Sequence, residues 1–251
     1  MDMTGDHLLA IPVFNEQRYL SRVLAEARRY SRNILVVDDG STDRSGDILH
    51  RHEGIDVITH LENRGYGQSL ASAFEFAQRH RYGWLITMDC DEQHEPSCIP
   101  KFLAAAACDD SDVVSGTRYP RGYDGDAAPA DRRAINRRIT AMINRRLNLN
   151  ITDAFCGFKA YRVSALRHFR ITVPGYAMPM QFWVQLARAE LRVKELPVRL
   201  IYHDPTRYFG GILDDPKARL THYLEVFEGE MRSGAVSPVL RESSTGCIPC
   251  R

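Results

Sequence analysis

Short, wholly apolar runs that each end in a polar cluster are the feature that most constrains the fold of this chain. Three of them cover residues 8–14 (LLAIPVF), 34–37 (ILVV) and 84–88 (WLITM), and segments with helical periodicity separate them. Continuous apolar strands between amphipathic helices predict an α/β fold, a Rossmann-like, mostly parallel sheet flanked by helices. In such sheets ligands bind beyond the carboxyl ends of the strands, where these polar clusters fall. The sequence therefore predicts a binding site along one edge of the sheet.

The second half of the chain is less regular, but no linker in it marks a boundary between domains. Residues 120–131 are rich in Gly, Pro, Ala and Asp, which is typical of a loop, and a basic amphipathic helix is expected over residues 132–147. We expect a single domain over residues 1–230 and a disordered tail over residues 231–251, which contains a Cys247–Cys250 CxxC pair.

Charge and composition exclude some classes of protein. The net charge of +1 argues against a general nucleic-acid binder, so we expect no nucleic-acid partner. No run of 18 apolar residues is present, and the N-terminus lacks a signal-peptide pattern, which together predict a cytoplasmic protein. The scattered positions of the cysteines favour reduced thiols, as in an intracellular protein. His50, His52 and His60 are expected at the surface.

The sequence Asp89-Cys90-Asp91 directly follows a buried strand, and Gln93 comes two residues later. Side chains two apart on an extended segment point the same way, so these three can converge on one hard cation. Oxygen ligands favour Mg²⁺ or Mn²⁺, whose coordination shells are usually completed by substrate phosphates and water.

Two further polar clusters end the first two strands. Asp38 and Asp39 can accept hydrogen bonds from a base or ribose, as an acid beyond a strand does in dinucleotide folds, or one of them can cap the next helix. The segment Pro12–Glu16 offers an aromatic face for a base, or simply a turn before a helix.

Taken together, six stretches resemble glycosyltransferase family 2, which has the GT-A fold, and within it the dolichyl-phosphate mannose synthase branch. The stretches are IPVFNE (11–16), VVDDGSTD (36–43), NRGYG (63–67), MDCDEQHEP (88–96), VVSGTRY (113–119) and DAFCGFKAYR (153–162). The resemblance covers roughly residues 8–228 in the family's order, and it implies a GT-A domain with acceptor-side elements toward its C-terminus.

The resemblance also implies roles for individual residues. The donor's base and ribose would be held by Pro12, Phe14, Glu16 and Asp39. The metal would be held by Asp89, Asp91 and Gln93. The phosphates would be met by Arg118, by Arg132 or Arg133, and by Arg207. Two positions depart from the family pattern: Phe14 replaces a common Tyr, and the segment from Arg207 lacks the Ser-Lys of the family's late Arg-x-x-Gly-x-Ser-Lys loop.

The implied reaction is transfer of a hexose, with inversion, from a nucleotide-diphosphate sugar such as GDP-mannose or UDP-glucose to a polyprenyl phosphate. A divalent ion and arginines would stabilise the leaving group, which gives Asp91 and Arg118 catalytic roles. A phosphate acceptor is already anionic and needs orientation more than a base. If a base is needed, Asp153 is the candidate; it can equally serve to order the turn beside it.

The lipid acceptor depends on the helix expected over residues 132–147. Its apolar stripe is surrounded by six arginines, an arrangement found in helices that lie in a membrane interface. The same pattern also fits a helix packed on the domain with a solvated basic face. Peripheral contact with the cytoplasmic membrane face is therefore one of two interpretations.

Three other functions fit parts of the pattern. The acceptor can be a soluble glycan or a small-molecule hydroxyl. A sugar nucleotidyltransferase would carry a Gly-rich loop ending in Arg and Lys after the first strand, where this chain has PVFNE. A non-catalytic nucleotide-binding module would be free to lose Asp89, Asp91 and Gln93. This chain has all three, which argues against such a module.

Overall fold

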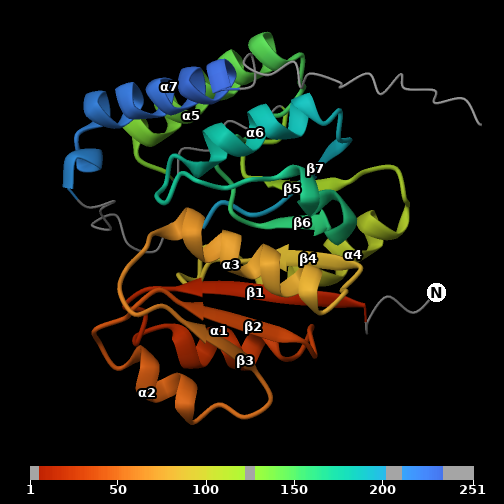
Figure 1. Cartoon of the computed structure of the whole chain (residues 1–251), viewed down its shortest axis with the longest axis vertical. Coiled ribbons are helices and arrows are strands. Elements are labelled where there is room, and N and C mark those ends of the chain that lie inside the picture. The colour runs from red at the N-terminus through yellow and green to blue at the C-terminus, as the bar shows by residue number, and fades with distance from the viewer. Residues whose placement is uncertain (1–5, 122–127, 202–210, 234–251) are drawn as a thin grey trace, which may run out of the picture.

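A seven-stranded sheet runs through the middle of the molecule, in a computed structural model that describes residues 6–121, 128–201 and 211–233 (Figure 1). The strands are β1 (His7–Val13), β2 (Ile34–Asp38), β3 (Asp56–Thr59), β4 (Trp84–Thr87), β5 (Val113–Thr117), β6 (Lys159–Arg162) and β7 (Val193–Pro197). Their order across the sheet is β3-β2-β1-β4-β6-β5-β7. Among these strands β6 is antiparallel to both its neighbours, and the other pairs are parallel. The predicted mostly parallel α/β sheet is therefore confirmed.

Helices cover both faces of this sheet. They are α1 (Leu20–Ala27), α2 (Ser45–His50), α3 (Tyr66–Arg79), α4 (Ile99–Ala107), α5 (Ala130–Leu147), α6 (Met178–Arg188) and α7 (Pro216–Ser233), with short 3₁₀ turns at Pro96–Cys98, Val163–His168 and Gly211–Asp214. The alternation of side chains along β1 shows why two layers form: Leu8 and Ala10 pack with α3, α5, α6 and α7, whereas Leu9 and Ile11 pack with α1 and α4. A strand that is apolar on both faces requires cover on both.

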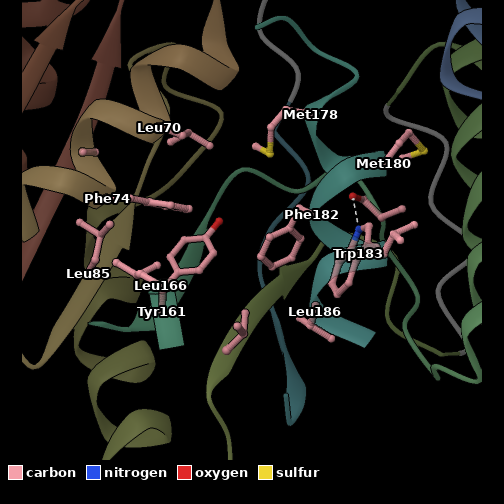
Figure 2. Packing of buried hydrophobic residues seen from close by; sticks show 14 of the residues in the cluster. Leu70, Phe74, Leu85, Tyr161, Leu166, Met178, Met180, Phe182, Trp183 and Leu186 are labelled. Carbon is pink, nitrogen blue, oxygen red and sulfur yellow. Dashed lines mark hydrogen bonds between the residues drawn. The ribbon is translucent and has the colours of Figure 1, made fainter. Parts of the chain in front are cut away.

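Aromatic side chains fix α3 and α6 on one face of the sheet. Figure 2 shows Phe74, Tyr161 and Phe182 in a row, with ring centroids 5.1 Å apart in the first pair and 5.7 Å apart in the second. The buried Trp183 indole donates from Nε1 to the Ala154 carbonyl oxygen at 2.9 Å, drawn as a dashed line in Figure 2. This contact anchors the turn that precedes β6, which also carries Asp153.

The apolar stripe of α5 lies inside the protein. Ile139 and Ile143 are 0% exposed and Ile135 is 8% exposed, because α5 packs against α6 and α7. The stripe is therefore covered by protein, and α5 is a packed helix with a basic outer face, whereas peripheral membrane contact through that face stays a prediction. Across the residues described, no helix is long and apolar enough to span a membrane.

The C-terminal helix α7 extends to Ser233, three residues beyond the predicted domain end. Within it, Tyr223 and Phe227 are buried in the same apolar cluster as α5 and α6. Arg207 and the Cys247–Cys250 pair lie outside the described residues, so the predictions made for them stay predictions.

Candidate functional site

A cavity of about 500 Å³ opens at the carboxyl edge of β1, β2, β4 and β5. The sequence expectation placed the site at this edge, and nine predicted residues line the cavity: Pro12, Phe14, Glu16, Asp39, Asp89, Asp91, Gln93, Arg118 and Arg132. Arg133 and Asp153 are not among its lining residues. Segments far apart in the chain therefore meet here in one hollow.

The loop after β1 is held in place by the loop after β2. Asn15 adopts a left-handed conformation with φ of 57°, and its Oδ1 accepts from the backbone N–H of Thr42 at 2.8 Å. The Asn15 N–H donates to Ser41 Oγ at 3.0 Å, and the Glu16 N–H donates to Ser45 Oγ at 3.0 Å. These contacts leave the Phe14 ring 41% exposed at the cavity, a position from which an aromatic face can stack on a base.

Asp39 organises the loop over residues 63–67. Its carboxylate accepts from the backbone N–H of Arg64 at 2.9 Å and of Gly65 at 2.7 Å, and it lies 2.6 Å from His60 Nδ1. The other ring nitrogen of His60 lies 2.9 Å from Ser72 Oγ, and the residue is 7% exposed. The expectation that His60 is a surface residue is therefore wrong: the sequence does not reveal that its partner directly follows the neighbouring strand β2.

Asp38 does not cap a helix through its side chain in this structure. Its Oδ1 accepts from the N–H of Ser41 at 3.0 Å, which tightens the turn after β2, while α2 begins after Arg44 without a side-chain cap. Asp43 Oδ1 instead accepts from the N–H of Ser45 at 2.8 Å within the first turn of that helix.

The two carboxylates of Asp89 and Asp91 reach the cavity from the end of β4. Asp91 Oδ1 accepts from the Gln93 N–H at 3.1 Å, and the Asp89 N–H donates to His94 Nδ1 at 3.1 Å. Burial and the negative charge of Asp91 raise the pKa of Asp89, while His94 opposes that rise. Two acids so placed make the cavity wall a place where positive charge is favoured.

The turn before β6 fits closely over this acid pair at Gly157. A Cβ atom added there would lie 2.6 Å from Asp89 Oδ2 and 2.8 Å from the hydroxyl oxygen of Tyr66. The Gly157 carbonyl accepts from Thr87 Oγ1 at 2.7 Å, which fixes the turn to the end of β4. Glycine is therefore required by close approach, and Tyr66, which the sequence analysis did not single out, borders the acid pair.

Residues here fit a divalent cation in part. Asp89 Oδ1 is buried without a hydrogen-bond partner, so this oxygen could serve as a ligand of a cation. Among the described residues no three His, Cys, Asp or Glu side chains gather as a metal site, so Asp89 and Asp91 would need oxygens from Gln93, substrate or water to complete a shell.

Arg118 lines the cavity with Asp153 directly behind it. The guanidinium donates from Nε to Asp153 Oδ2 at 2.7 Å and from Nη2 to Oδ1 at 3.0 Å. Asp153 is 0% exposed and also accepts from Asn136 Nδ2 at 2.8 Å and from the Phe155 N–H at 3.0 Å. Burial opposes ionisation of Asp153, yet the Arg118 charge and these hydrogen bonds hold its pKa well below the usual range.

Further cations line the cavity from α5, α7 and β6. Arg132 and Arg219 both line it, whereas Arg133 donates from Nη1 to the Ala128 carbonyl at 3.1 Å. Lys159, on β6, is buried and donates from Nζ to Ser115 Oγ at 2.7 Å, and burial lowers its pKa. Arg219 and Lys159 were not predicted as site residues: Arg219 lies outside the six family-like stretches, and Lys159 lies within the stretch 153–162 but was given no role there.

Known proteins resemble this chain over most of its length. Residues 9–170 match the family model described as glycosyl transferase family 2. An undecaprenyl-phosphate mannosyltransferase from Micrococcus luteus is 28% identical over 227 residues, which cover 86% of this chain and 93% of that protein. A polyprenol monophosphomannose synthase from Mycolicibacterium smegmatis is 25% identical over 201 residues, covering 76% of each chain.

Among solved structures, the chain resembles glucosyl-3-phosphoglycerate synthase from Mycobacterium tuberculosis in complex with phosphoglyceric acid. The TM-score is 0.69 at 15% identity, with 91% of this chain and 82% of that chain covered. Identity at this level shows the fold alone, and that fold is the one expected from the six sequence stretches.

Proposed function

The chain belongs to glycosyl transferase family 2, and we propose that it moves a hexose from a nucleotide-diphosphate sugar to a polyprenyl phosphate. The names of its two relatives, an undecaprenyl-phosphate mannosyltransferase and a polyprenol monophosphomannose synthase, support this acceptor class. They also make mannose the first sugar to test, with a GDP-mannose or UDP-glucose type of donor.

The observation that carries the proposal is that acidic and basic side chains line the same cavity. Acidic side chains from the ends of β2 and β4, Asp39 and Asp89 among them, line this cavity together with Arg118 and Arg132. A nucleotide sugar has a polar nucleoside at one end and a diphosphate beside the reacting carbon. Such a molecule fits a site that offers both hydrogen-bond acceptors and guanidinium groups.

In this arrangement Phe14, Pro12 and Glu16 hold the base and ribose, and Asp39 shapes the loop that borders them. A Mg²⁺ or Mn²⁺ ion held by Asp89, Asp91 and Gln93 would supply charge to the leaving diphosphate. Arg118 provides a fixed positive charge for the same purpose, because Asp153 locks its orientation.

The acceptor phosphate attacks the anomeric carbon from the face opposite the leaving group, which inverts its configuration. A phosphate monoester has its second pKa near ~6 and is largely anionic at neutral pH, so no side chain has to remove a proton. Asp153 suits this scheme as a positioning residue, since it is fully buried and paired with Arg118.

Contact with a membrane surface would use the outer face of α5. Arg137, Arg138 and Arg145 are exposed there, and guanidinium groups on a helix face are attracted to anionic lipid headgroups. This contact is peripheral and electrostatic, since the apolar stripe of the helix is buried in the protein core.

The experiment is sugar transfer from a panel of labelled nucleotide sugars, with Mn²⁺ or Mg²⁺, into organic-extractable polyprenyl phosphate. We expect lipid-linked product that is lost with EDTA and in Asp91→Ala, and retained in Asp47→Ala, which removes an exposed acid of α2. NMR of the product then reports the anomeric configuration.

Donor hydrolysis without lipid product, from every sugar in the panel, would contradict the lipid acceptor. The acceptor would then be a soluble glycan or small-molecule hydroxyl, with Asp153 tested as its base. Absence of both sugar transfer and cation-dependent donor hydrolysis would contradict the proposal that this chain is an active glycosyltransferase.

A further inference from the structure

Arg219, on the C-terminal helix α7, is a buried arginine that lines the cavity outside the region matched to the family. It is 3% exposed, and the family match ends at residue 170. Its guanidinium donates from Nη2 to Asp131 Oδ2 at 2.6 Å and from Nη1 to the Leu213 carbonyl at 2.8 Å. A positive charge is thus held firmly in the cavity wall by α5 and the turn before α7.

Within the described part of the chain, helix α7, which carries this charge, does not adjoin the loops after β1 and β2 that are proposed to hold the nucleoside. Figure 1 shows α7 and α5 together at one end of the molecule and β3 and α2 at the opposite end. One turn beyond Arg219, the buried Tyr223 also lines the cavity, with its ring 4.9 Å from that of Phe155. Burial raises the pKa of Tyr223 to about 12, and Arg219 and Arg132 both act against that rise, so both charges lie within electrostatic range of one hydroxyl.

A second ion pair shows that fastening α7 to α5 does not require a buried arginine. Arg146 on α5 and Glu228 on α7 join the same two helices, with Nη1 2.7 Å from Oε1, and both side chains are about two-fifths exposed at 40% and 39%. In the Arg219 pair the arginine side chain is 4% exposed and Asp131 is 39% exposed. Burying an arginine is costly, so its location at the cavity points to a use beyond the tie.

We propose that Arg219 is a further phosphate-binding residue of this enzyme and contacts the phosphate headgroup of the acceptor. The proposal rests on the function proposed above. A guanidinium has five N–H donors and pairs well with phosphate, so it can keep its bond to the Leu213 carbonyl while phosphate oxygens replace Asp131. Apolar and aromatic side chains that line the same cavity, Tyr223, Phe155 and Ile135, are suited to the first isoprene unit of the lipid.

The test is steady-state kinetics with polyprenyl phosphate and the best donor from the panel. Arg219→Gln is expected to raise the KM for polyprenyl phosphate about 10- to 100-fold, which corresponds to the loss of one hydrogen bond to a charged group. The KM for the donor should stay within about twofold of the wild-type value. Arg219→Lys should fall between Gln and wild type. Asp131→Asn keeps the arginine and should leave the acceptor KM unchanged or lower.

The matched control is Arg146→Ala, which breaks the remote tie between the same helices and should leave both KM values unchanged. Thermal unfolding of each variant separately reports the effect of the substitution on stability. If Asp131→Asn raises the acceptor KM as much as Arg219→Gln, Arg219 is a structural tie. If Arg219→Gln raises the donor KM as much as the acceptor KM, Arg219 does not act on the acceptor phosphate specifically. Either result makes the inference wrong. Should wild type form no lipid product, the proposed function has failed instead.

Discussion

Arg118 and Asp153 face each other through two parallel hydrogen bonds, from Nε to Oδ2 and from Nη2 to Oδ1, at 2.7 and 3.0 Å. The backbone N–H of Arg118 donates to the same carboxylate at 3.1 Å. Asp153 is 0% exposed, whereas the Arg118 side chain keeps 18% exposure and lines the cavity. The buried carboxylate therefore holds the guanidinium from the side facing the protein core. The arginine is therefore oriented before any substrate arrives.

Removing the charge of Asp153 should destabilise the fold. In Asp153→Asn the Arg118 guanidinium loses its ionised partner in a mostly buried site, and we expect the free energy of unfolding to fall by about 3–5 kcal/mol. Urea unfolding measures this. Asp110→Asn, which breaks an exposed pair with Lys194, should cost about 1 kcal/mol or less. A free energy of unfolding equal to that of wild type would contradict a stabilising role for this ion pair.

The same pair makes stability depend on pH in the acid range. Since Arg118 holds the folded-state pKa of Asp153 below its unfolded value of about 3.9, the unfolded chain takes up this proton first. The contribution is complete above the unfolded pKa and is lost as pH falls from about 4 toward the lower folded-state value. Thermal melts between pH 7 and 3 should therefore show the gap between wild type and Asp153→Asn narrowing below pH 4; a gap independent of pH would argue against the shift.

A methyl group at Gly157 should disturb the acid pair. In Gly157→Ala the new Cβ would lie 2.6 Å from Asp89 Oδ2, so the carboxylate or the turn must move. We expect weaker Mn²⁺ binding, measured by electron paramagnetic resonance, and a loss of about 1–3 kcal/mol in stability. Gly175→Ala is the matched control, because a Cβ at Gly175 meets nothing within 4 Å. Equal Mn²⁺ binding by both variants would refute this role for Gly157.

His60 should matter for donor binding although it does not line the cavity. His60→Ala removes a partner of Asp39, the acid that holds the N–H groups of Arg64 and Gly65, and should cost about 1–3 kcal/mol. The loosened loop should also raise the KM for the nucleotide sugar. His52→Ala serves as the control in unfolding and kinetic measurements. If both variants behave alike, the Asp39 cluster does not support the donor loop.

The sheet and its functional edge could be predicted because their signals are local. An apolar run such as residues 34–37 identifies a buried strand, and Asp89 and Asp91 stand directly after another, so both the layer and the edge follow from short segments. Nine of the predicted site residues accordingly line one cavity.

What could not be predicted depends on contacts between distant segments. The stripe of α5 has the same periodicity whether it meets lipid or protein, and only the presence of α6 and α7 decides that Ile139 is in the core. In the sequence His60 resembles any histidine that follows a strand, and only the folded structure shows that Asp39 lies 2.6 Å from it. Arg219 differs from other helix arginines only through its burial beside Asp131.

The reversed direction of β6 has a consequence for how this architecture can diversify. Because Lys159 pairs with Thr87 and Ser115, the chain entering β6 arrives at the same edge where the chain leaving β4 and β5 departs. An insertion before residue 159 would therefore remodel the chemistry, whereas one after Arg162 would emerge at the far rim of the sheet. Evolution or a designer can extend that rim with a new module while the reaction centre keeps its shape.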